Sequence, residues 1–230
     1  MSRPKIELTV LFVLFACAQT VASAQVEGNP ANWCRNGLYT HDAAGFRVGR
    51  VVGAKGARAY FYGDASEDCP GAGAKCRQKA YLIPGDAVVV SRRLGDYLCA
   101  WYAPAKGAET VGWLRADDVT ISEADAGTPL SRWLGAWEYA GQSLDIRRGT
   151  KAGALAVSGE AFWRGQGDNV HVGEVGFEAA PAANVLKLEE NEDLCSVTIR
   201  LVGPHLVVSD NLKCGGLNVT FNGVYRKKKD

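Results

Sequence analysis

Short apolar runs separated by Gly, Pro, Asp and Lys recur along most of this chain. Between Arg58 and Ile121 the runs are about five residues long, too short for amphipathic helices and typical of antiparallel strands. The first reads Arg58-Ala59-Tyr60-Phe61-Tyr62, in which Ala59 and Phe61 alternate with the tyrosines. We therefore expect an all-β protein in which residues 58–122 form a small antiparallel barrel.

The same alternation resumes at Arg132 and continues to Tyr225. It predicts about eight or nine further strands, a number suited to a second antiparallel barrel or a sandwich in residues 132–230. Residues 123–131 are acidic and small and show no apolar period, so we interpret them as a linker between two independently folding domains. Residues 25–57 are interpreted as an irregular arm, in which only Phe46 to Val52 resembles a strand.

The first 24 residues have the three-part layout of a cleaved secretory signal. Arg3 and Lys5 precede an apolar run from Leu8 to Ala18, and the small residues Ala22-Ser23-Ala24 follow before Gln25. The run is shorter than the roughly 20 apolar residues of a membrane-spanning helix, so no span is expected in the mature chain. A lipid anchor on Cys17 is the alternative. The signal predicts a periplasmic or secreted bacterial protein.

Cleavage would remove Cys17 and leave six cysteines, an even number that indicates disulfides in an exported protein. Cys69 and Cys76 close a small loop and are expected to pair with each other. In the strand Tyr97 to Tyr102, Leu98 and Ala100 would face the barrel interior, which points Cys99 outward. The predicted pairs are Cys34 with Cys99, Cys69 with Cys76, and Cys195 with Cys214.

Charge and motifs exclude several classes of function. The signal contains two of the 26 basic and one of the 25 acidic residues, which leaves 24 of each in the mature chain. A neutral protein is a poor candidate for binding nucleic acid. The cysteines lack zinc-binding spacing, and His41, His171 and His205 accompany no catalytic motif. We expect no enzyme activity, no metal and no other cofactor.

Three motifs follow one another along the predicted strands of residues 58–121. They are Ala80-Tyr81-Leu82-Ile83-Pro84-Gly85-Asp86-Ala87-Val88, Gly95-Asp96-Tyr97 and Gly112-Trp113-Leu114. In this order they resemble the bacterial SH3-like domains of exported cell-envelope proteins. The match spans about sixty residues and departs from the usual pattern at Cys99 and in the long loop that contains Cys69 and Cys76. The resemblance implies a non-catalytic recognition module for peptidoglycan or for a peptide or protein of the envelope.

The C-terminal segment from Asp210 to Tyr225 resembles the end of uncharacterised proteobacterial exported proteins, whose role is unknown. The barrel architecture expected for residues 132–230 is similar in shape, and not in sequence, to small periplasmic β-barrel inhibitors of lysozyme. The alternative function is therefore an inhibitor or immunity protein that acts against a cell-wall-degrading enzyme.

Aromatic side chains are the best candidates for a ligand-binding surface. Tyr60, Tyr62, Tyr97 and Trp101 alternate with the predicted core, and flat aromatic faces suit peptide backbones or sugar rings. Burial beneath the arm is an equal alternative for Trp101.

Asp210, Asn211 and Asn218 could hold a calcium ion through their side-chain oxygens, although a structural turn is favoured for them.

Overall fold

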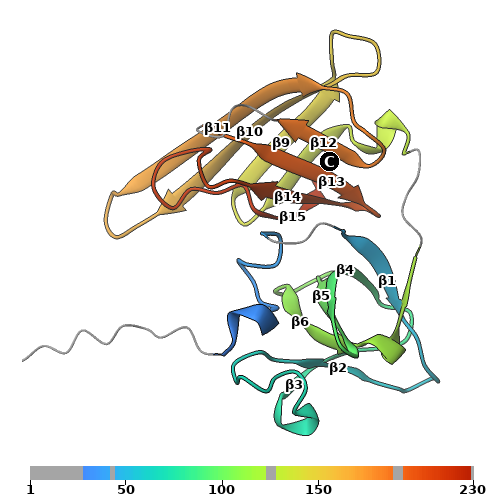
Figure 1. The fold of residues 1–230 in the computed structure, drawn as a ribbon. Coiled ribbons are helices and arrows are strands. Elements are labelled where there is room, and N and C mark those ends of the chain that lie inside the picture. Colours follow the sequence, from blue (N-terminus) through green and yellow to red (C-terminus); the bar gives the residue numbers. More distant parts are fainter. Residues whose placement is uncertain (1–27, 42–44, 123–127, 189–193, 229–230) are drawn as a thin grey trace, which may run out of the picture.

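The computed structural model describes residues 28–41, 45–122, 128–188 and 194–228 (Figure 1). The expected signal segment and Cys17 lie outside these ranges, as does part of the expected linker. The described residues form two antiparallel sheets and four short 3₁₀ turns, Pro30–Asn32, Gly73–Lys75, Ala116–Asp118 and Leu130–Arg132. The predicted all-β class is confirmed.

The N-terminal sheet has seven strands in the order β3-β2-β6-β5-β4-β1-β7. Their bounds are β1 Arg47–Val51, β2 Ala59–Tyr62, β3 Arg77–Leu82, β4 Ala87–Leu94, β5 Tyr97–Tyr102, β6 Thr110–Arg115 and β7 Val119–Ile121. The boundary predicted at residue 58 is wrong, because β1 lies inside this sheet between β4 and β7. The apolar alternation of Phe46 to Val52 therefore marked a strand of the sheet, and not part of the arm.

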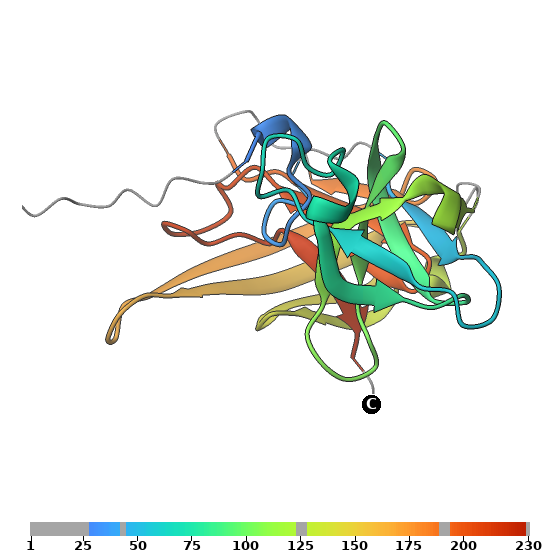
Figure 2. The same cartoon turned by 90° about the horizontal axis from the view of Figure 1, so that it is seen from below.

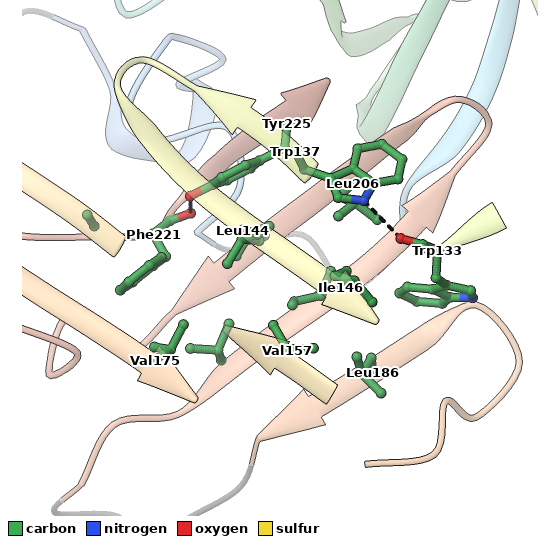
Figure 3. Packing of buried hydrophobic residues seen from close by; sticks show 14 of the residues in the cluster. Trp133, Trp137, Leu144, Ile146, Val157, Val175, Leu186, Leu206, Phe221 and Tyr225 are labelled. Carbon is green, nitrogen blue, oxygen red and sulfur yellow. Dashed lines mark hydrogen bonds between the residues drawn. The ribbon is translucent and has the colours of Figure 1, made fainter. Parts of the chain in front are cut away.

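The C-terminal half forms an eight-stranded, nearly closed antiparallel barrel (Figure 1). Its strands are β8 Gly135–Tyr139, β9 Gln142–Arg148, β10 Leu155–Arg164, β11 Val170–Ala179, β12 Val185–Leu188, β13 Val197–Val202, β14 His205–Asp210 and β15 Gly223–Lys227. Strands β11 and β12 are the two ends of the hydrogen-bonded order and lie close to each other. The interior is filled by large apolar side chains (Figure 3), with the Trp137 indole nitrogen donating to the Trp133 carbonyl at 2.9 Å.

The N-terminal sheet encloses a core of its own on the side that the alternation predicted. Phe61 is 1% exposed and packs with Leu98 and Ala100. The opposite face of the same strands carries Cys99, which is bonded to Cys34 of the arm. The other two disulfides, Cys69–Cys76 and Cys195–Cys214, are likewise the pairs expected from the sequence.

A third apolar cluster joins the two halves of the molecule. From the arm and the N-terminal sheet it contains Cys34, Tyr39, Phe46, Val89, Tyr97, Cys99, Trp101 and Trp113, and from the outer face of the barrel Val202, Val207 and Val224. We call this set the shared cluster. The arm adds polar links: the Tyr39 hydroxyl donates to the Val89 carbonyl, and the Ser209 hydroxyl donates to the Thr40 carbonyl. This packing argues against independent folding of the two halves.

His205 lies at the edge of the shared cluster, with its ring 4.9 Å from that of Trp101. Burial, and then the charge of Arg226, lowers the pKa of His205 from 6.5 to about 4. The folded protein therefore favours the neutral His205 ring. The contribution of this preference to the free energy of unfolding is fully present above pH 6.5 and is lost as the pH falls toward 4. At 1.36 kcal/mol per pKa unit the loss amounts to at most about 3 kcal/mol.

We expect urea unfolding to show this loss between pH 7 and pH 4. His205→Gln should make the free energy of unfolding less dependent on pH over this interval. Equal pH dependence in the natural chain and the His205→Gln variant would contradict the assignment.

Candidate functional site

The outer face of the β2–β3 hairpin carries an exposed aromatic surface. Ala59 and Phe61 point into the core, so Tyr60 and Tyr62 point outward and are half-buried. Tyr60 lies directly opposite Tyr81 of β3, which is 43% exposed. The hairpin therefore presents a tyrosine from each of its two strands side by side.

Two arginines extend this pair into a continuous stack. The Arg58 guanidinium lies over the Tyr81 ring at 4.4 Å, the Tyr81 and Tyr60 ring centroids are 5.6 Å apart, and the Arg77 guanidinium lies over the Tyr60 ring at 4.8 Å. We call these four residues the arginine–tyrosine stack. Each cation over a ring contributes about 0.5–1 kcal/mol at an exposed site, enough to orient the side chains before a ligand arrives.

The position of Arg77 depends on an irregularity in the hairpin. The register shifts between the pair Tyr60–Tyr81 and the pair Tyr62–Arg77, so β3 contains extra residues opposite Phe61. A bulge of this kind bends the strand and redirects its side chains. It brings the exposed Arg77 side chain alongside Tyr60.

The stack is positively charged and accessible. Arg58 and Arg77 are exposed, as is Lys79 on the same strand, and β3 is an edge strand of the sheet. Side-chain hydrogen bonding with Tyr60, and then the influence of Tyr81, raises the pKa of Arg58 above its ordinary value. The surface thus combines fixed cations with flat apolar rings, which suits an extended ligand that bears carboxylates.

Only part of the predicted aromatic surface is available to a ligand. Tyr62 packs edge-on against Tyr97 at 5.2 Å, but Tyr97 is only 8% exposed. Trp101 is 3% exposed within the shared cluster, and its indole nitrogen donates to Glu109 at 2.8 Å. The placement of Tyr97 on a binding surface was wrong, and for Trp101 the alternative of burial is correct, because the barrel and the arm cover that face of β5.

The Asp210 segment has a structural role. The Asp210 carboxylate accepts hydrogen bonds from the Leu212 and Phe221 backbone amides, the Thr220 hydroxyl and the Asn222 side chain. These bonds hold the loop that follows β14, as the turn interpretation expected. Within the described ranges no cluster of three or more His, Cys, Asp or Glu side chains could hold a metal ion.

No family model matches this chain, and neither a curated protein nor a solved structure is significantly similar to it. Among the residues that the structure describes, no helix has the length and apolar character needed to cross a membrane. The three disulfides indicate an oxidising environment outside the cytoplasm, where such bonds persist.

Proposed function

We propose that this protein is an exported, non-catalytic binding protein that recognises peptidoglycan, with the arginine–tyrosine stack as its contact surface. The observation that carries the proposal is the pair of adjacent rings, Tyr81 and Tyr60, with Arg58 and Arg77 at its two ends on one exposed face. The resemblance of residues 58–121 to bacterial SH3-like envelope domains supports it independently. Carboxylated envelope peptides that are not part of the wall are the nearest alternative ligands.

The chemistry of the polymer fits that of the stack. Peptidoglycan joins sugar rings, which pack against aromatic faces, to short peptides that carry carboxylates. Guanidinium groups bind carboxylates through paired hydrogen bonds, and their charges remain fixed across the physiological pH range. Because the contacts combine apolar stacking with exposed charge, binding should weaken with added salt without being abolished.

We expect the mature chain to pellet with purified peptidoglycan and Tyr60→Ala to reduce this binding about thirtyfold. The reason is that truncation of an aromatic anchor at an interface costs on the order of 2 kcal/mol. Tyr81→Ala should have a similar effect, because each ring supports the other. Titration of the chain against a fixed amount of polymer gives the affinity.

Conservative and matched variants separate binding from folding. Tyr60→Phe retains the ring and should bind nearly as well as the natural chain. Arg58→Ala should weaken binding, whereas Arg93→Ala, an exposed arginine on β4, should not. Each variant should keep the melting temperature of the natural chain, because the stack lies outside both cores. Full binding by a Tyr60→Ala, Tyr81→Ala double variant would disprove the assigned surface.

A further inference from the structure

The hairpin formed by β10 and β11 extends beyond the rest of the barrel (Figures 1 and 2). Strand β10 pairs with β9 only as far as Glu160, whereas its pairing with β11 continues to Arg164. The outer part of the hairpin is therefore a two-stranded ribbon. A two-stranded ribbon is marginally stable by itself and needs packing on at least one face.

One face of this ribbon is packed within the chain. The Gly216 amide donates to the Val172 carbonyl, and the loop that contains Cys214 lies against Gly173. A Cβ atom on Gly173 would lie 2.4 Å from the Cys214 carbonyl oxygen, so the contact is tight. The Trp163 and His171 rings stack 5.1 Å apart on this same side of the ribbon.

The opposite face of the ribbon is apolar and exposed. Phe162 and Val172 are cross-strand partners with 41% and 53% of their surface exposed, and Val170 beside them is 41% exposed. Arg164 lies beyond this apolar centre, toward the hairpin tip. Glu160 and Glu174 lie on its other side and directly oppose each other across the strands. Two like charges in this arrangement repel each other.

We propose that this face binds a second copy of the chain, forming a two-fold dimer centred on Phe162 and Val172. In such a dimer the same patch serves both partners. Glu160 and Arg164 are each two residues from Phe162, about 7 Å away in opposite directions along β10. Antiparallel packing would therefore set Arg164 of each copy against Glu160 and Glu174 of the other. The apolar centres would cover each other, and each guanidinium would relieve a repelling carboxylate pair.

The proposed interface is small, so the dimer should be a transient one. Sedimentation velocity of the disulfide-bonded mature chain, from about 5 to 500 µM, should show a monomer–dimer equilibrium with a dissociation constant of about 0.1 mM. Phe162→Ser should abolish the dimer, and Arg164→Glu should weaken it at least about tenfold. Thermal unfolding verifies that each variant remains folded.

A charge exchange distinguishes this surface from others. Combining Arg164→Glu with Glu160→Arg and Glu174→Arg should restore the dimer, because each altered charge then meets its opposite on the second copy. Arg148→Glu, an exposed position on β9, makes the same change of charge elsewhere and should have no effect. A monomer at every concentration, a dimer unaffected by Phe162→Ser, or failure of the exchanged variant to associate would overturn the proposal.

Discussion

Replacing Val207 with Asp should destabilise both halves of the molecule together. Val207 is fully buried on the outer face of β14, where it packs in the shared cluster against residues of the N-terminal sheet and the arm. A carboxylate there would be removed from water with only the half-buried Arg200, opposite it on β13, as a partner, and burial of such a pair recovers little of the desolvation cost. The net cost is on the order of 3–5 kcal/mol, close to the whole stability of a marginal domain. Urea unfolding should be followed separately by far-ultraviolet and near-ultraviolet circular dichroism. In the variant, both signals should change in a single transition at a lower urea concentration than in the natural chain.

Val52→Asp is the matched control, because Val52 is 40% exposed and its replacement should change stability little. Residues 128–230 produced alone provide a second measurement. Without the N-terminal sheet, this fragment would expose Val202, Val207 and Val224, and we expect it to aggregate. A soluble fragment with the melting temperature of the full chain would show that the barrel folds independently and that the shared cluster contributes little.

Removal of the Cys34–Cys99 disulfide by a Cys34→Ala, Cys99→Ala double variant should cost about 4 kcal/mol. The two cysteines are separated by 65 residues, and in the chain-entropy model a cross-link stabilises more as the loop that it closes becomes longer. The loss should also loosen the arm, whose Tyr39 and Thr40 contact the sheet and the barrel. Urea denaturation measures the loss in the free energy of unfolding, and hydrogen exchange of the backbone amides of residues 28–41 measures the loosening of the arm.

The corresponding double variant of Cys69 and Cys76 is an internal comparison. That bond spans a separation of only seven residues, for which the same model predicts about 2.5 kcal/mol. Its loss should affect the loop between β2 and β3 and leave exchange in the arm unchanged. Equal costs for the two variants would contradict the argument from loop length.

Alternation along single strands could be predicted from the sequence. The inward direction of Phe61, Leu98 and Ala100, and the outward direction of Cys99, follow from a period of two, and the structure agrees. The side of the sheet that faces outward was therefore predicted correctly. Alternation alone does not show what covers an outward side chain, which is why Tyr97 was misplaced and Trp101 was left with two alternatives.

The sequence nevertheless contained an indication that both faces of some strands are covered. Val88-Val89-Val90, Leu98-Cys99-Ala100-Trp101 and Leu206-Val207-Val208 are continuous apolar runs, and each of these residues is buried. An uninterrupted run is typical of a strand that is covered on both faces. The arginine–tyrosine stack was harder to predict, because the shifted register that brings Arg77 to Tyr60 has no signature in the local pattern.

The shared cluster has a consequence for how such a chain could arise by recombination. Small β modules are commonly joined to new partners because their outer faces are polar and need no match. Here Val202, Val207 and Val224 of the barrel must meet an apolar face of complementary shape on any replacement module. We therefore expect the two halves to be inherited as one unit. A chimaera that replaces the N-terminal half should fold only when the new module offers such a face or when these three valines are made polar.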